Sequence, residues 1–170
     1  RGRLIFPINN ISGQPIALGG RIIEKSDYLA KYINSPETNF FKKGSNLYNL
    51  DSARKLSNKL NNIYLVEGYM DVVGLSKNGI ENAVANLGTA LTDKQIITLN
   101  QFFDDIVICF DGDESGYKAA LRAAENSIKN LKPEKQISFL FLPKNEDPDS
   151  FVNKNGKNFF LDFSKQSKIS

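Results

Sequence analysis

The pattern of apolar and polar positions changes about a third of the way along the chain. Residues 3–8 (RLIFPI) and 16–23 (IALGGRII) are apolar and strand-like, and the NNISGQP between them consists of turn-forming residues. We therefore predict a hairpin or small sheet. Residues 24–50 show no regular period, and aromatic residues lie beside lysines in their loops. A helix is predicted to begin at Asp51, because Ala53, Leu56 and Leu60 recur at three- and four-residue spacing.

Strand and helix patterns alternate in the rest of the chain. Strands are predicted over residues 63–66, 82–86, 105–110 and 136–142. Helices are predicted between these strands. The helix after the first strand is closed by Gly79, the helix after the second strand is opened by Thr92 with Gln95 at capping-box spacing, and the helix after the third strand ends at Pro133. This alternation predicts a mostly parallel sheet with helices on both faces. Residues 144–156 break the pattern, and KNFFLDFS (157–164) is compatible with a short helix or a tail.

The distribution of charge supports a division into three parts. The 170 residues carry a formal charge of +3, which is too small to indicate a polyanionic partner. Residues 1–59, however, hold ten basic and four acidic residues, and clustered acids follow. We expect an incomplete basic N-terminal subdomain over residues 1–60, an α/β domain over 61–143, and the start of a C-terminal helical segment over 144–170.

The composition excludes several kinds of site. Histidine is absent and Cys109 is the single cysteine, which removes disulfides, Cys/His zinc sites and histidine-based catalytic triads. The sequence has neither an apolar run of about 18 residues nor an export signal. We expect a cytoplasmic protein that does not enter a membrane. Because the chain starts without Met, we interpret it as a segment of something longer.

Acidic residues follow three of the predicted strands. Glu67 follows the first, Asp111 and Asp113 follow the third, and Asp147 and Asp149 come a few residues after the fourth. Because the carboxyl ends of parallel strands share one edge, we expect these acids to converge. Asp71, four residues after Glu67, would lie on the same helix face.

Convergent carboxylates repel one another unless protons or cations offset their charge. Oxygen ligands without His or Cys favour Mg²⁺ or Mn²⁺. We expect Gly112 to let the backbone turn so that Asp111 and Asp113 address the same ion. The alternative is that each acid is a helix cap or a solvated loop residue, and for Asp113 or Asp149 taken alone this is the favoured interpretation. Acids after three strands of the same predicted sheet favour the metal site.

Several segments together resemble a known family. VEGYMDVV (66–73), AVANLGTALT (83–92), CFDGDESG (109–116) and FLPKNEDPDS (141–150) resemble the Toprim module of bacterial DnaG-type primases. Residues 1–8, 19–21 and 31–50 resemble the segment that precedes Toprim in those primases. The block from SPET to KG is the most specific, because Toprim nucleases and topoisomerases share the acids but not this block.

The resemblance implies an α/β fold, with a Toprim-type mostly parallel sheet flanked by helices and preceded by a smaller basic α+β subdomain. It implies a DNA-dependent RNA polymerase that makes short RNA primers for replication by two-metal nucleotidyl transfer, with Mg²⁺ or Mn²⁺ and without zinc in this segment. The implied catalytic residues are Glu67, Asp111 and Asp113. The implied metal ligands are Glu67, Asp71, Asp111, Asp113, Asp147 and Asp149. The implied nucleotide- and template-binding residues are Arg1, Arg3, Arg21, Lys31, Asn34 and Lys43.

The implied partners are single-stranded DNA template, ribonucleoside triphosphates, the RNA primer, and a replicative helicase bound through a region outside this segment; we expect a monomer. Phe40, Phe41 and Tyr48 are candidates for stacking on bases, although at least one of the two phenylalanines is better suited to a small core. Glu114 departs from the family, whose members commonly carry a basic residue there.

Two other classes remain open at this point. A Toprim nuclease or topoisomerase would share the central acids. A phospho-acceptor receiver domain also places Asp at strand ends, but it would not require the basic region of residues 1–60.

Overall fold

A three-stranded antiparallel sheet forms the N-terminal part of the computed structural model, which describes residues 2–24, 28–129 and 132–169. Strands β1 (Arg3–Asn9) and β2 (Pro15–Ile22) form the predicted hairpin, and β3 (Tyr32–Asn34) pairs with β2. Within the turn, Asn10 Oδ1 accepts the backbone N–H of Ser12 and of Gln14, both at 3.0 Å. The turn residues of the sequence therefore close the hairpin through a local side-chain bond.

The second sheet contains four parallel strands in the order β5-β4-β6-β7. They are β4 (Asn62–Val66), β5 (Ala83–Ala85), β6 (Asp105–Phe110) and β7 (Gln136–Phe141). Each of the three neighbouring pairs is parallel. The predicted parallel sheet is confirmed, and its strands therefore share one carboxyl edge.

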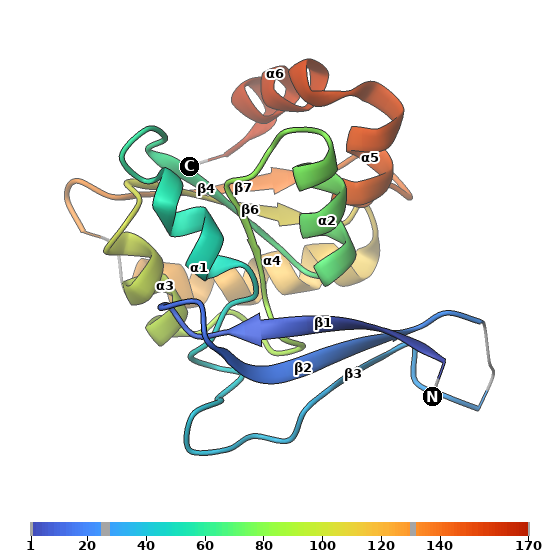
Figure 1. The fold of residues 1–170 in the computed structure, drawn as a ribbon. Helices are drawn as coiled ribbons and strands as arrows, with labels where there is room; N and C mark the ends of the chain where they lie inside the picture. The colour runs from blue at the N-terminus through green and yellow to red at the C-terminus, as the bar shows by residue number, and fades with distance from the viewer. Residues whose placement is uncertain (1, 25–27, 130–131, 170) are drawn as a thin grey trace.

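Helices cover both faces of this sheet (Figure 1). One face carries α1 (Leu50–Ala53), α3 (Asp93–Asn100) and α4 (Glu114–Ile128), and a 3₁₀ turn (Arg54–Leu56) follows α1. The other face carries α2 (Tyr69–Lys77), α5 (Pro148–Asn155) and α6 (Lys157–Ser167). Alternate residues of the central strands supply the two cores. Ile63, Leu65, Ile106 and Ile108 point to the first face, and Tyr64, Val66, Val107 and Cys109 to the second.

Two predicted helix boundaries are confirmed. The Thr92 side chain accepts the Gln95 N–H at 3.3 Å, and Gln95 Oε1 accepts the Thr92 N–H at 3.1 Å, so both halves of the capping box form. Gly79 follows the end of α2 with φ of 80°, a conformation that glycine adopts without strain.

The predicted start of α1 is wrong. Asn49 occupies the position before the helix, in the left-handed region at φ 67°, and its Nδ2 donates to the Ala83 carbonyl at 2.9 Å. Asp51 lies inside the first turn and accepts a 3.0 Å bond from Asn9 Nδ2. Leu60 lies beyond both the helix and the 3₁₀ turn. A tertiary bond to β5 thus fixes the start of a helix only four residues long.

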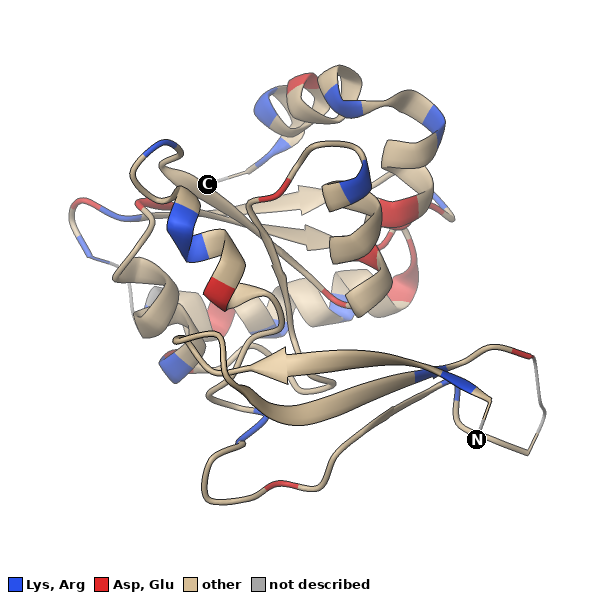
Figure 2. Cartoon of the chain, in the orientation of Figure 1, with Lys and Arg blue, Asp and Glu red and all other residues tan. Residues whose placement is uncertain are grey.

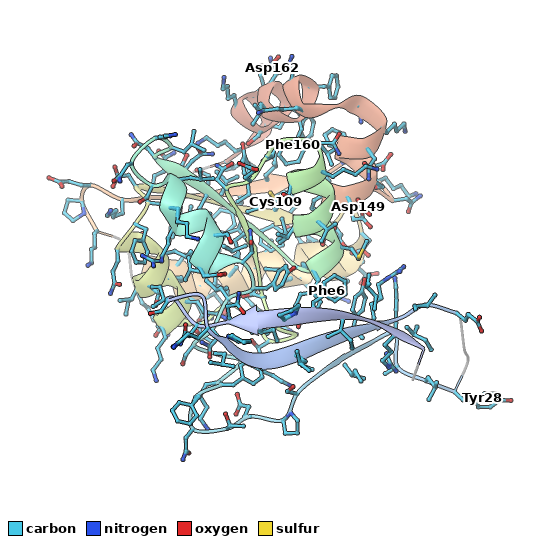
Figure 3. The ribbon with its side chains drawn as sticks, viewed as in Figure 1. Phe6, Tyr28, Cys109, Asp149, Phe160 and Asp162 are labelled. Atoms are coloured by element: carbon cyan, nitrogen blue, oxygen red, sulfur yellow. The ribbon has the colours of Figure 1, made fainter. Side chains whose placement is uncertain are left out.

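The two C-terminal helices refine the prediction for residues 144–170. Residues 144–156, where the strand and helix pattern breaks, contain α5, and residues 157–164 belong to α6 rather than to a tail. Phe160 on α6 is fully buried and contacts Tyr64 of β4 edge to face, with ring centroids 5.3 Å apart (Figure 3). In the part of the chain that the structure describes, no helix is long and apolar enough to cross a membrane.

A third cluster of buried residues joins the small sheet to the large one. Its members are Phe6, Ile8, Ala17, Phe41, Tyr69 and Leu87. Phe41 is completely buried whereas Phe40 is 81% exposed, which confirms that one of the two phenylalanines belongs to a core. Figure 3 shows Phe6 pointing from the small sheet toward the body of the molecule. The small sheet is therefore packed in place by apolar contacts.

Candidate metal-binding edge

The topology of the parallel sheet creates a crevice between β4 and β6. The chain passes from β4 to β5 on one side, and from β6 to β7 on the other. Ligands of open α/β sheets bind at the carboxyl ends of strands where the connections diverge in this way. Glu67 follows β4 directly and Asp111 follows β6 directly. The fold therefore places these two carboxylates on either side of the crevice.

The acids of three loops act on one another electrostatically. Burial raises the pKa of Asp111 to about 7, with further contributions from Glu67, Asp147 and Asp113. Burial also raises the pKa of Asp71 to about 7, assisted by Asp111 and Asp147. The pKa of Glu67 is raised by desolvation and then by Asp113. The structure thus brings together the acids that follow β4, β6 and β7.

The donor atoms at this edge fit a hard divalent cation. Asp111 Oδ1 is buried and has no hydrogen-bond partner among the described residues, and an unpaired buried acceptor is costly. An all-oxygen, all-carboxylate set suits Mg²⁺ or Mn²⁺. Within residues 2–24, 28–129 and 132–169, no three His, Cys, Asp or Glu side chains are close enough together to enclose an ion. The site is an open edge of neighbouring carboxylates.

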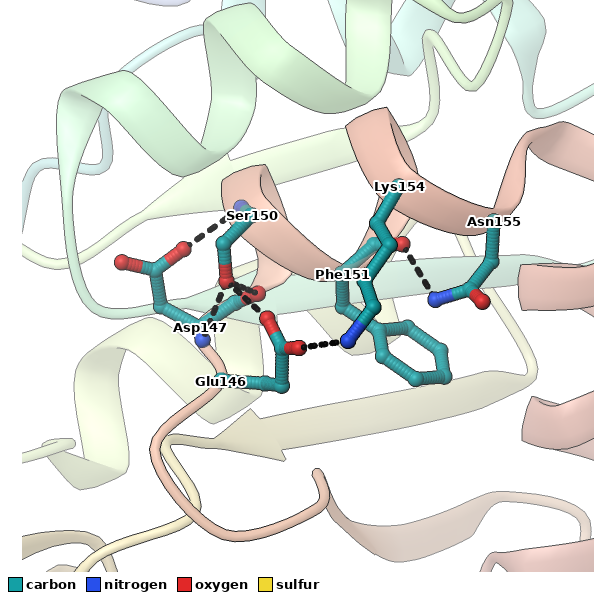
Figure 4. A network of polar contacts seen from close by, with 6 residues as sticks. All are labelled: Glu146, Asp147, Ser150, Phe151, Lys154 and Asn155. Carbon is teal, nitrogen blue, oxygen red and sulfur yellow. Dashed lines mark hydrogen bonds and ion pairs between the residues drawn. The ribbon is translucent and has the colours of Figure 1, made fainter.

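Asp113 and Asp147 also begin helices. Asp113 Oδ1 accepts the Gly116 N–H at 2.7 Å at the start of α4, and Asp147 Oδ1 accepts the Ser150 N–H at 2.7 Å at the start of α5. The second bond is visible in Figure 4, where Glu146 also accepts from Ser150 Oγ and pairs with Lys154. These bonds lower the pKa of Glu146. One oxygen of each capping aspartate is therefore engaged locally, as the helix-cap alternative predicts.

Asp71 and Asp149 link α2 to α5. Asp71 Oδ2 accepts the Gly68 N–H at 3.0 Å, and its Oδ1 accepts the Asp149 N–H at 3.4 Å. A Cβ atom on Gly74 would lie 2.1 Å from Asp149 Oδ1, so this close helix contact requires glycine. Asp149 lies beside α2 in Figure 3 and accepts a 2.6 Å bond from Asn153. Asp71 is thus a buried residue that links α2 to α5 through hydrogen bonds, and it also interacts electrostatically with Asp111.

A close contact between two loops explains why residue 112 is a glycine. Positive φ is not what requires glycine here, since Gly112 is not among the described residues with that conformation. Instead, its N–H donates to the Glu146 carbonyl at 3.0 Å and its own carbonyl accepts the Asn145 N–H at 3.1 Å. A Cβ atom would lie 1.8 Å from the Pro143 carbonyl oxygen. Close packing of the β6 and β7 loops therefore selects glycine.

The predicted nucleic-acid residues lie on and beside the small sheet. Figure 2 shows basic positions at the end of this sheet near the N-terminus, and acidic positions where α2, α4 and α5 come together. Arg3 Nη1 donates to the Lys31 carbonyl at 3.4 Å, and Lys31 Nζ lies 5.6 Å from the centre of the Tyr32 ring. Arg21 Nε is buried without a partner among the described residues. Arg1 lies outside the described residues.

Asn34 and Lys43 are built into the junction between the two parts of the molecule. Asn34 Nδ2 donates to the Leu87 carbonyl at 3.0 Å, and Asn34 Oδ1 accepts from the Tyr69 hydroxyl. The Lys43 N–H donates to Glu37 Oε1 at 2.7 Å, and its carbonyl accepts from Gln95 Nε2 at 3.1 Å. The carboxamide of Asn34 is therefore used within the protein.

Two further predictions concern Tyr48 and Glu114. The Tyr48 ring packs edge to face on Tyr69, with centroids 4.9 Å apart, so it is a partly buried residue packed against the third core cluster. Glu114 is exposed at the start of α4 and pairs with Lys118 at 2.6 Å, one turn further along the helix. Exposed pairs of this kind contribute little to stability.

A small cavity beside Glu67 was not predicted from the sequence. Its volume is about 230 Å³, and its lining includes Asn86, the loop 88–91 and Arg122 of α4. Asn86 Oδ1 is buried without a partner among the described residues. The metal-binding edge was predicted from acidic residues that follow strands. Asn86 and Arg122 are not acidic, so that pattern does not predict them.

Family models match two successive parts of the chain. Residues 61–141 match the Toprim domain, and residues 1–54 match the N-terminal domain of the DNA primase catalytic core. The DNA primase of Pseudomonas aeruginosa is 49% identical over 160 residues, which are 94% of this chain and 24% of that protein. The DNA primase of Neisseria meningitidis serogroup A is 48% identical over 162 residues, or 95% of this chain and 27% of the relative.

Solved structures agree with this similarity. A DNA primase domain from Pseudomonas aeruginosa superposes with a TM-score of 0.94 at 47% identity, covering 99% of this chain and 52% of that one. The E. coli primase catalytic core gives 0.92 at 42% identity, covering 98% and 53%. A DnaG primase catalytic domain bound to single-stranded DNA gives 0.91 at 41% identity, with the same coverage. The chain spans about a quarter of the curated relatives and about half of these solved chains.

Proposed function

The chain belongs to the bacterial DnaG-type primases as part of their catalytic core, and we propose that it carries the polymerising site that synthesises short RNA primers on a DNA template. The observation that carries the proposal is the pair formed by Glu67 and Asp111 at the crevice of the sheet, with Asp111 Oδ1 buried and unpaired among the described residues. The division at residues 60 and 143 belongs to the same proposal.

The proposed reaction depends on positioning and charge. A primer 3′-hydroxyl attacks the α-phosphate of a ribonucleoside triphosphate, and pyrophosphate leaves. Bound Mg²⁺ or Mn²⁺ supplies Lewis-acid stabilisation of the attacking and leaving oxygens. Glu67, Asp111 and Asp113 would hold the ions, while Asp71, Asp147 and Asp149 fix the surrounding loops and add negative charge. A histidine base is not needed, which agrees with the composition.

The basic residues of the small sheet and the following loop serve the template and the triphosphate in this proposal. Arg3 lies on β1, Arg21 lies on β2 and Lys31 directly precedes β3. Lys43 lies in the loop that contacts α3. Contacts of lysine and arginine with phosphates give salt-dependent binding with little sequence preference. A relative bound to single-stranded DNA supports this class of template. Arg1 and the helicase partner remain predictions.

A Toprim nuclease or topoisomerase is not favoured. Residues 1–54 match the N-terminal domain of the DNA primase catalytic core. A Toprim nuclease or topoisomerase would not account for this part of the chain.

The proposal is tested with Glu67→Gln and Asp111→Ala in the intact protein. Both changes remove a carboxylate from the crevice, and we expect each to reduce RNA primer synthesis on single-stranded DNA by roughly 100-fold or more, since transition-state charge is then uncompensated. Glu81→Gln is the matched control, because Glu81 is an exposed acid next to β5 rather than at the edge. Near-normal priming by both edge variants would refute the proposal.

A further inference from the structure

Tyr69 connects the acidic edge to the small sheet. It is the first residue of α2 and follows Glu67 by two positions, yet only 4% of it is exposed. Its ring stacks on Phe6 of β1, with centroids 5.0 Å apart and planes 8° from parallel. The Tyr32 ring of β3 lies 6.4 Å away. One side chain of the β4–α2 region therefore contacts two strands of the small sheet.

The hydroxyl of Tyr69 adds a directional bond to this stacking. It donates to Asn34 Oδ1, while Asn34 Nδ2 donates to the Leu87 carbonyl at 3.0 Å. Asn34 thus joins β3 to two segments of the large domain, one after β4 and one after β5. Desolvation raises the pKa of Tyr69 to about 12, so the hydroxyl keeps its proton and remains a donor at neutral pH. We call this pair of bonds the Tyr69–Asn34 bridge.

The small sheet is shaped to admit the tyrosine ring. Gly19 lies opposite Asn34 in the β2–β3 pairing. A Cβ atom on Gly19 would lie 2.6 Å from the Tyr69 ring, closer than packed atoms approach. The missing side chain therefore makes the space in which the ring reaches Asn34.

The bridge lies between the two groups of residues that the proposed reaction must bring together. Arg21 and Tyr32 are paired across β2 and β3, two positions along the strands from the Gly19–Asn34 pair. Strand side chains alternate between faces, so the side chain of Tyr32 shares the face of Asn34, and that of its partner Arg21 shares the face of Gly19. The other end of the bridge is in the turn that carries Glu67.

We propose that the Tyr69–Asn34 bridge sets the position of the template-binding sheet relative to the metal-binding edge, so that Tyr69 and Asn34 act as positioning residues for nucleotide addition. The inference rests on the proposed function and gives Asn34 a role other than direct binding. Transfer between two bound reactants is sensitive to small displacements, and a shift of about 1 Å can cost roughly 100-fold in rate. Binding of the strand by flexible cations is far less sensitive to such a shift.

The test uses Tyr69→Phe, Asn34→Ala and the double variant in the intact protein. Tyr69→Phe keeps the stacked ring and removes only the hydroxyl. We expect each single variant to lower kcat for primer synthesis roughly 10- to 100-fold, with KM for ribonucleoside triphosphates and the Kd for single-stranded DNA within about twofold of wild type. Because both changes break one bridge, the double variant is expected to be no slower than the slower single variant.

The control is Tyr64→Phe, which removes another buried tyrosine hydroxyl, on β4 in the core beneath α6. It should leave kcat unchanged. Urea unfolding of every variant verifies that the native fold is retained. Additive losses in the double variant, or an unchanged kcat in Tyr69→Phe, would overturn the inference. A loss confined to the Kd for DNA in Asn34→Ala would also overturn it, in favour of direct template contact. Absence of priming by the wild-type protein would instead contradict the proposed function.

Discussion

The loop contact at Gly112 allows a stability change to be calculated from the structure. In Gly112→Ala the new Cβ atom would lie 1.8 Å from the Pro143 carbonyl oxygen and 2.8 Å from the Leu142 carbonyl oxygen. These are backbone atoms, so the loops after β6 and β7 must separate. The separation breaks the bonds from Gly112 N–H to Glu146 and from Asn145 N–H to Gly112.

The magnitude follows from three contributions. Each lost bond costs about 1 kcal/mol, and displacement of packed groups costs about 1–3 kcal/mol. Restriction of the unfolded chain by alanine offsets about 0.4–1 kcal/mol. We therefore expect the free energy of unfolding to fall by about 2–5 kcal/mol, a large part of the stability of an ordinary domain.

The assay is urea unfolding followed by circular dichroism, with Gly20→Ala as the matched control. A Cβ atom on Gly20 would meet only side-chain atoms, the nearest being Arg3 Cδ at 3.3 Å. The control should therefore stay within about 1 kcal/mol of wild type. Since Gly112 lies between Asp111 and Asp113, the variant should also bind Mn²⁺ more weakly. A Gly112→Ala protein as stable as wild type would refute the reasoning from loop contact.

Three further predictions concern the core, the edge and a helix cap. Phe41→Ala should lower the free energy of unfolding by about 3–5 kcal/mol because the ring is fully buried, whereas Phe40→Ala should change it by less than about 0.5 kcal/mol; equal losses in urea unfolding would contradict the assignment. Asp71 and Asp111 have pKa values raised from 3.8 to about 7, so the native state binds more protons and stability should fall as pH rises from 3.8 to about 7. Urea unfolding across this range should show the decrease in the free energy of unfolding, and added Mg²⁺ should make that decrease smaller at pH 7. A free energy of unfolding that does not change with pH would refute the raised pKa values. Thr92→Ala should cost about 1 kcal/mol in the same assay, since the hydroxyl caps α3, and an unchanged midpoint would show that the cap is dispensable.

The arrangement of the parallel sheet could be predicted because it depends on local patterns. Runs such as IVICF and the alternation of strands with helices indicate strand direction without knowledge of any contact. Strand direction then places Glu67 and Asp111 at one edge, and the raised pKa values agree with that placement. The capping box at Thr92 is equally local, because both partners lie within one turn.

The features that were missed depend on contacts between distant segments. Asn49 starts α1 through a bond to Ala83, 34 positions away, whereas the sequence pattern favours Asp51. Gly112 is required by a neighbouring loop, and Tyr48 is held in a cluster with Tyr69. Asn34 appears in the sequence as a polar residue suited to ligands, but its partners Leu87 and Tyr69 are separated from it by 53 and 35 positions. Spacing along the chain does not report such pairs.

The central place of β4 has a consequence for the order in which the protein is assembled during translation. Strand β4 leaves the ribosome before both of its neighbours, and the sheet then grows outward, first with β5 on one side and later with β6 on the other. Glu67 is therefore synthesised well before Asp111 can approach it. The nascent chain acquires mutual repulsion between these carboxylates only when β6 pairs with β4. By then α2 and β5 have been synthesised, whereas α5 and α6, which complete the core on that face, come later in the chain.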